Sequence, residues 1–166
     1  LVTVGVPGKP DVRSKNPDGQ LRMQRSGYVH TTHVDGDAAY YTVAVELLHP
    51  QTNARNLCAT VLAGEPLYCP GASENITTGQ PQFESDQTRI EIVRVLPDQN
   101  VEFGNLPYSQ LIVALDGARI LPVSGGGPGQ TLRPGDFVWF DKGGPARTFE
   151  NKSDKIARVV TFAFKP

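Results

Sequence analysis

The chain is predicted to fold as an all-β protein, a sandwich or barrel of short strands. Seventeen glycines and 14 prolines among 166 residues favour many turns over long helices. Short apolar or alternating segments recur at regular spacing after residue 83, and no stretch has the period of an amphipathic helix. A chain of this length can bury a sizeable core, so we expect one domain, or one domain with a long extension.

The first 36 residues are predicted to form an extended N-terminal arm, and residues 37–166 the barrel domain. Clusters of Pro, Gly and Asp in the arm leave room for short strands only. Residues 40–48 are β-prone and nearly continuously apolar, which predicts a buried strand. Residues 57–62 predict a second, short strand, and the region from 69 to 81 is expected to be a loop.

From residue 83 onward the pattern becomes regular. Residues 88–96 alternate apolar and polar side chains over most of their length, as a half-buried strand does. Asp116-Gly117 is a strong hairpin signal. The glycine-rich run 124–129 is expected to join strands rather than to bind phosphate, because no helix follows it. Strands are expected at residues 88–96, 109–115, 118–123, 137–140, 147–150 and 156–164.

Two cysteines, Cys58 and Cys69, lie on either side of a turn-rich stretch. This separation suits a local disulfide, which would stabilise the fold by roughly 3 kcal/mol on a loop-entropy model. The alternative is two independent buried thiols. A disulfide implies an oxidising compartment, so we expect a periplasmic or secreted protein.

The charge balance excludes several classes of partner. Sixteen basic and 17 acidic residues give a formal net charge of −1, which offers no electrostatic basis for binding nucleic acid or an anionic membrane.

No apolar run approaches the roughly 18 residues that a membrane-spanning helix needs. The chain begins at Leu1 with no visible signal peptide, and we expect that a leader was removed or the chain was trimmed.

A motif in the last third of the chain links the predicted strands to a known family. Gly135 opens it, Gly144 stands three residues before Arg147, and Asn151 closes it. This layout resembles the second sequence motif of the cupin superfamily, with secreted bacterial cupin-like proteins among the similar members. The resemblance covers residues 83–166 and implies a jelly-roll β-barrel to which the N-terminal arm adds extra strands.

The metal ligands of the cupin family are replaced in this chain. Arg147 stands where the second motif has its metal-binding histidine, and Gln110 stands where the first motif has its glutamate. The family's paired histidines would fall at residues 103–106, where Asn105 is at best a weak oxygen ligand. The resemblance therefore implies a barrel without its usual metal, and we expect no cofactor.

The histidines of the chain leave one alternative open. His30, His33 and His49 would have to meet in space to hold a divalent metal such as copper, iron, zinc or manganese. The simpler interpretation leaves His30 and His33 exposed and makes His49 a hydrogen-bonding residue at the end of a strand.

If the alignment to the family holds, a small set of residues surrounds the mouth of the barrel. An inward-pointing guanidinium at Arg147 needs an anion, because it cannot lose its proton and is costly to bury unpaired. The anion is either internal, from Asp141, Glu150 or Glu102, or the carboxylate, sulfate or phosphate of a ligand. The predicted ligand-binding residues are Arg147, Gln110, Tyr108, Asn105 and Trp139.

Three functions follow from these observations. The preferred hypothesis is a metal-free, cupin-like binding or structural module that holds a small anionic or carbohydrate ligand in the barrel mouth. The second is a cupin-class metalloenzyme, an oxidoreductase or isomerase, with a non-standard histidine site. The third is an assembly protein without a working pocket. An apolar strand at residues 40–48 would invite pairing with a second subunit, so a homodimer is expected.

Overall fold

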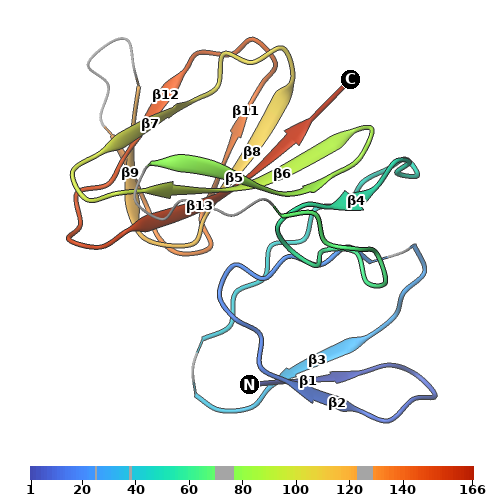
Figure 1. The fold of residues 1–166 in the computed structure, drawn as a ribbon. Helices are drawn as coiled ribbons and strands as arrows, with labels where there is room; N and C mark the ends of the chain where they lie inside the picture. Colours follow the sequence, from blue (N-terminus) through green and yellow to red (C-terminus); the bar gives the residue numbers. More distant parts are fainter. Residues whose placement is uncertain (25, 38, 70–76, 123–128) are drawn as a thin grey trace.

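The computed structural model describes residues 1–24, 26–37, 39–69, 77–122 and 129–166. Thirteen strands and no helix are present in these residues (Figure 1). Accordingly, the described residues include no helix long and apolar enough to cross a membrane. The strands are β1 (Val2–Gly5), β2 (Val12–Ser14), β3 (Thr31–Val34), β4 (Arg55–Asn56), β5 (Thr78–Glu84), β6 (Thr88–Val95), β7 (Asn100–Phe103), β8 (Ser109–Ala114), β9 (Ala118–Pro122), β10 (Gln130–Leu132), β11 (Phe137–Phe140), β12 (Arg147–Glu150) and β13 (Ala157–Phe164).

Two antiparallel sheets form the jelly roll. One has the order β11-β8-β13-β6-β5-β4 and the other the order β10-β9-β12-β7. Between β6 and β13 the chain crosses several times from one sheet to the other, so several neighbouring strands, such as β8 and β13, are distant in sequence. Both sheets contribute to a common core, because each strand turns alternate side chains inward. The buried core residues are Val93, Val95, Phe103, Ile112, Ala114, Ile120, Leu132, Val138, Phe140, Phe149, Ala157 and Val159.

The outer face of the six-stranded sheet carries a second apolar cluster. Its buried members include Phe83, Leu111 and Val160, and residues that precede β5 in the sequence cover it. Met23 contributes both a side chain packed on this cluster and a backbone N–H that donates to the Val61 carbonyl at 2.8 Å. The N-terminal third of the chain therefore shields a sheet face that would otherwise lie in water.

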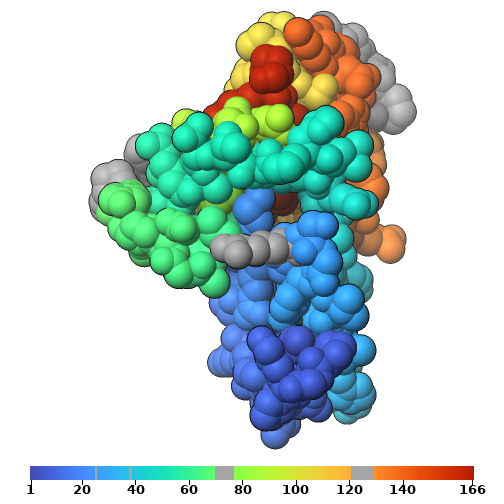
Figure 2. Space-filling view, turned by 90° about the vertical axis from the view of Figure 1, so that its right-hand side faces the viewer, coloured from blue at the N-terminus to red at the C-terminus, as the bar shows by residue number. Residues whose placement is uncertain are grey.

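The N-terminal arm contains a small sheet of its own, with the order β2-β1-β3. Val2 is buried in this sheet, and the Asp35 carboxylate accepts hydrogen bonds from Thr3 and Arg13. Figure 2 shows this sheet (blue) at one end of the molecule, with residues around 40–60 (teal) between it and the jelly roll. The short strands predicted for the arm are thus present, but they form a separate sheet and do not extend the sheets of the jelly roll as expected.

The predicted strand at residues 40–48 is wrong. This segment forms no strand, and Tyr41 and Leu48 are exposed, while Val45 packs on the outer apolar cluster. Its β propensity is overridden because the segment crosses the sheet face instead of pairing with a sheet edge. The predicted strand at 57–62 is also absent, because a disulfide and the Asn56 side chain hold this stretch in a tight loop.

The expected loop before residue 81 is partly wrong as well, since β5 begins at Thr78. Gly79 and Pro81 suggested a loop, but the pairing of β5 with β6 shifts register between Pro81 and Phe83. Such an irregularity lets a strand contain a proline, which has no N–H to donate.

The other predicted strands agree with β6, β8, β9, β11, β12 and β13 to within about two residues. β7 and β10 were not predicted. The glycine-rich run expected to join two strands lies almost entirely outside the described residues. The all-β jelly-roll prediction is confirmed by the two facing antiparallel sheets.

Candidate functional site

The inner face of the six-stranded sheet turns polar at one end. The strand register places Phe140, Gln110, Ala163, Arg89 and Glu84 in one row across β11, β8, β13, β6 and β5. Directly paired residues of antiparallel strands project to the same face, so these five side chains share the end of the sheet. We call them the mouth row. The rows further in are largely apolar and belong to the core.

Gln110 is the least satisfied residue of the mouth row. Its side chain shares the inner face of β8 with Ile112 and Ala114 and is only 7% exposed. Its Oε1 atom is buried without a hydrogen-bond partner, and no other side-chain N or O atom of the described residues is in this condition. An unpartnered buried acceptor costs about 1–3 kcal/mol, so this oxygen is a position where a donor would be favourable. The predicted inward direction of Gln110 agrees with this placement.

Arg147 lies in the opposite sheet, with its side chain on the inward face. It begins β12, pairs in register with Phe103, and lies on the same side of the strand as the buried Phe149. Its guanidinium carbon lies 5.4 Å from the centre of the Phe140 ring, a cation–π distance. Phe140 is the direct strand partner of Gln110. Phe140 therefore neighbours both predicted site residues, Gln110 through strand pairing and Arg147 through its guanidinium.

The internal ion pair expected for Arg147 is not formed. Within the part of the chain that the structure describes, no salt bridge includes Arg147. Glu150 pairs with Lys152 at 2.9 Å, Asp141 accepts a hydrogen bond from the Trp139 indole, and Glu102 is exposed. Glu150 follows Arg147 by three residues on a strand, so its side chain projects to the other face. The guanidinium thus rests on an aromatic ring without any of the three expected carboxylates.

Trp139 does not flank the mouth, contrary to the prediction. It pairs with Leu111, which belongs to the outer apolar cluster, and its ring lies 5.3 Å from that of Phe164. Because Val138 and Phe140 point inward, the residue between them must point outward. Trp139 is half exposed on the outer face of an edge strand.

The chain at Gly104 packs closely against the Phe140 ring. A Cβ on Gly104 would lie 2.8 Å from the Phe140 ring, and Gly104 has a positive φ of 91°, so only glycine fits here. Asn105 is exposed, and its backbone N–H donates to the Gly144 carbonyl at 3.0 Å. Tyr108 is half-buried just before β8. Neither feature brings the side chain of Asn105 or Tyr108 to Gln110 or Arg147, and a role of these two residues in binding stays a prediction.

An ionic network extends the mouth row to the sheet edge, and no pattern in the sequence indicated it. Glu84 accepts hydrogen bonds from Arg55 and from Lys165, each at 2.7 Å, and Arg89 lies between Glu84 and Glu91. The hydrogen bonds from Arg55 and Lys165 lower the pKa of Glu84 to about 2. Arg55 and Lys165 are remote from Glu84 in sequence, and the pairings of β4 with β5 and of β13 with β6 bring them to it.

The histidines are not gathered into a metal site. The ring of His30 lies 5.2 Å from that of Tyr28, His33 stands in β3 opposite Thr3, and the His49 carbonyl accepts from Gln51. No group of three or more His, Cys, Asp or Glu that could hold a metal occurs among the described residues. Gln110 and Arg147 do not suit a divalent cation either, because Gln110 offers one amide oxygen and the guanidinium of Arg147 is positively charged and has no acceptor atom. The donor set does not fit the family's metal.

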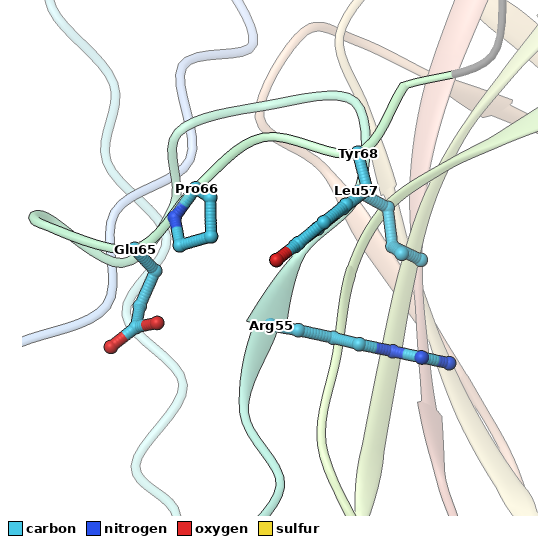
Figure 3. A pocket seen from close by; sticks show the side chains of 5 residues that line it. All are labelled: Arg55, Leu57, Glu65, Pro66 and Tyr68. Atoms are coloured by element: carbon cyan, nitrogen blue, oxygen red, sulfur yellow. The ribbon is translucent and has the colours of Figure 1, made fainter.

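The disulfide between Cys58 and Cys69 is formed, with their Cα atoms 4.4 Å apart. Beside it lies a surface pocket of 310 Å³, which Figure 3 shows from close by. No sequence motif indicated this pocket, because its walls come from both ends of the disulfide-closed loop and from β4. It is lined by Arg55, Leu57, Glu65, Pro66 and Tyr68.

Comparisons with known proteins find fold similarity only. No family model and no curated protein matches the chain. A cupin domain from Bordetella pertussis Tohama I is similar in structure, with a TM-score of 0.47 and 15% identity over 58% of this chain and all (100%) of that one. The cupin domain of an XRE family transcriptional regulator from Enterobacter cloacae has a TM-score of 0.45 and 17% identity over 54% of this chain and 96% of that one.

A third similar structure is a cupin-superfamily sugar phosphate isomerase from Silicibacter pomeroyi. Its TM-score is 0.42 at 20% identity, and the match covers 49% of this chain and 52% of that one, so this chain matches about half the length of that protein. The strand order of the two sheets carries the fold assignment.

Proposed function

We propose that this protein is a cupin-like binding module whose barrel mouth holds a small anionic ligand. The observation that carries the proposal is the pair of unsatisfied groups around Phe140. One is the buried Gln110 Oε1, which has no donor, and the other is the Arg147 guanidinium, which no carboxylate of the described residues neutralises. A ligand that brings both a negative charge and a hydroxyl or N–H group would satisfy both residues.

A hydroxylated anion suits these two residues better than a neutral sugar does. The guanidinium is always charged and offers two parallel N–H groups to a carboxylate or phosphate, whereas a neutral sugar would leave it without a counter-charge. Gln110 Oε1 can accept only, so it selects a group that donates. A neutral carbohydrate remains the alternative ligand.

The test is calorimetric titration with gluconate, malate, inorganic phosphate and glucose as probes. The proposal is supported if an anion binds and its affinity falls about tenfold or more in both Arg147→Ala and Gln110→Leu. The first variant removes a charged hydrogen bond to the ligand and the second removes a buried one. Arg133→Ala is the control, because Arg133 is an exposed arginine outside the mouth row. Binding of glucose alone would favour the carbohydrate alternative, and equal anion binding by Arg147→Ala would refute the mouth site.

The location proposed for the protein is the periplasm or the exterior of the cell. The disulfide between Cys58 and Cys69 supports it, because structural disulfides persist mainly in oxidising compartments. Mass spectrometry of the protein isolated from its native source under thiol-blocking conditions tests this. Two blocked thiols per chain would contradict an oxidising location.

The assembly function is a second candidate that one observation favours. β11 is the edge of the six-stranded sheet, and its outward side chains Phe137 and Trp139 are 61% and 48% exposed. An exposed apolar edge strand invites pairing, and we propose a homodimer through β11 rather than through residues 40–48, which form no strand. Light scattering after size exclusion should give twice the chain mass, and Phe137→Lys should give the monomer mass. A monomer for the unchanged chain at micromolar concentration would rule out this dimer.

A further inference from the structure

The pocket beside the disulfide has a fixed shape. Its walls Leu57 and Tyr68 are the immediate neighbours of Cys58 and Cys69, so the covalent bond sets the distance between them. In Figure 3 the Tyr68 side chain extends into the space between Pro66 and Arg55. A single disulfide thus determines both the position of the aromatic wall and the width of the pocket.

A second device holds the other wall of the pocket. Asn56 is fully buried, and its Nδ2 donates to the carbonyls of Leu62 and Glu65 at 2.9 and 3.1 Å. Its Oδ1 accepts from the backbone N–H groups of Val61 and Leu62 at 3.0 and 2.9 Å. One side chain therefore satisfies four backbone groups of the loop. These hydrogen bonds fix the part of the loop that contains Glu65 and Pro66 to β4.

This rigid loop presents an aromatic ring to solvent. Tyr68 is 60% exposed although its backbone is adjacent to the disulfide. Holding an aromatic ring rigid and exposed gives a surface for stacking with little loss of conformational entropy on binding. Core packing does not explain the position of Tyr68. Val61 and Leu62 of the same loop belong to the outer apolar cluster, whereas Tyr68 does not.

We propose that this pocket is a second binding site, separate from the barrel mouth, and that it takes a neutral saccharide. The pocket carries one guanidinium and one carboxylate, from Arg55 and Glu65, so it has no net charge to select an ion. Its polar groups both donate and accept, as the hydroxyls of a sugar do. Tyr68 and Pro66 supply the apolar faces against which the C–H groups of a sugar ring pack. The guanidinium of Arg55 is held by Glu84, whose carboxylate also pairs with Lys165, so this guanidinium is not free to bind an anion.

The experiment is a titration of the isotope-labelled protein with maltose, cellobiose and diacetylchitobiose, followed by backbone amide NMR. At least one disaccharide should shift the amides of Leu57, Glu65 and Tyr68 in a saturable way at millimolar concentration. Tyr68→Ala should weaken this binding by about tenfold or more, because it removes the stacking surface. No saturable shift at these three amides with any of the three sugars would overturn the proposal.

Two control variants separate this site from the barrel mouth and from binding to any exposed tyrosine. Tyr41→Ala removes a similarly exposed tyrosine outside the pocket and should leave the binding unchanged. Arg147→Ala should also leave it unchanged, so loss of sugar binding in that variant would assign the sugar to the barrel mouth and overturn this proposal. Reduction of the Cys58–Cys69 bond in protein that stays folded by circular dichroism should abolish the binding. Full binding by folded, reduced protein would contradict the role of the disulfide.

Discussion

The Asn151 side chain joins the two sheets of the jelly roll. Its Nδ2 donates to the carbonyl of Val95 at 2.8 Å and also to that of Lys155 at 2.7 Å, and Asn151 is fully buried. Val95 ends β6 in the six-stranded sheet, whereas Asn151 follows β12 in the four-stranded sheet. Asn151 closes the motif that resembled the cupin family, and its role is to fix the loop between β12 and β13.

Asn151→Ala should therefore destabilise the protein. The substitution leaves the buried carbonyl of Val95 without its donor and removes the acceptor of the Ser153 N–H, and we expect a loss of about 3 kcal/mol in the free energy of unfolding. Urea denaturation measures it. Asp154→Ala, an exposed neighbour in the same loop, is the control and should change stability by less than about 0.5 kcal/mol. Equal stability of the two variants would contradict the structural role of Asn151.

Reduction of the disulfide should lower the melting temperature. A bridge with a sequence separation of 11 contributes about 3 kcal/mol on the loop-entropy model, which at this chain length corresponds to roughly 6–12 °C. Differential scanning calorimetry with and without reductant measures the shift, with intact mass after alkylation to count free thiols. An unchanged melting temperature in protein that carries two alkylated cysteines would argue against this contribution.

Gln110→Leu should stabilise the ligand-free protein. Leucine has a similar volume and removes an acceptor that is buried without a partner, so we expect a gain of about 1 kcal/mol. Ile112→Val, on the same face of β8, is the matched control and should cost about 1 kcal/mol. A loss of stability in Gln110→Leu would mean that its amide makes favourable contacts in the free protein. That result would remove the main support for a ligand donor at Oε1.

Acid should weaken the fold through Glu84. Its pKa is lowered from 4.5 to about 2 by hydrogen bonds from Arg55 and Lys165, so the folded state favours the charged carboxylate. The resulting stability is fully present above pH 4.5 and is lost as the pH falls from 4.5 through about 2.

Glu84→Gln should thus be less stable than the unchanged protein at neutral pH, and its unfolding free energy should fall less steeply below pH 4.5. Urea denaturation across this range tests the prediction. Glu46→Gln, at an exposed glutamate of the segment that crosses the sheet, is the control. Parallel pH profiles for Glu84→Gln and the unchanged protein would contradict the assigned pKa shift.

The sequence predicted the strands whose pattern is local. Residues 88–96 alternate apolar and polar side chains, and β6 lies there. The edge strand β11 was predicted with its observed bounds. The prediction failed at residues 40–48, where β propensity is high but the segment pairs with no strand. It also failed at Trp139, because the facing of a strand depends on which neighbour is buried, and a shift of one residue reverses it.

By itself, then, the sequence determined the all-β architecture, the disulfide and two inward residues of the mouth, because periodicity, cysteine spacing and a motif are local properties. Tertiary structure alone decided how these features meet. The register of distant strands placed Gln110 beside Phe140 and gathered Arg55, Arg89 and Lys165 around Glu84. It also left Arg147 on an aromatic ring, away from the carboxylates expected to pair with it. Such contacts depend on strand order and register. These are selected by interaction energies summed over the whole sheet, and no single segment of the sequence encodes them.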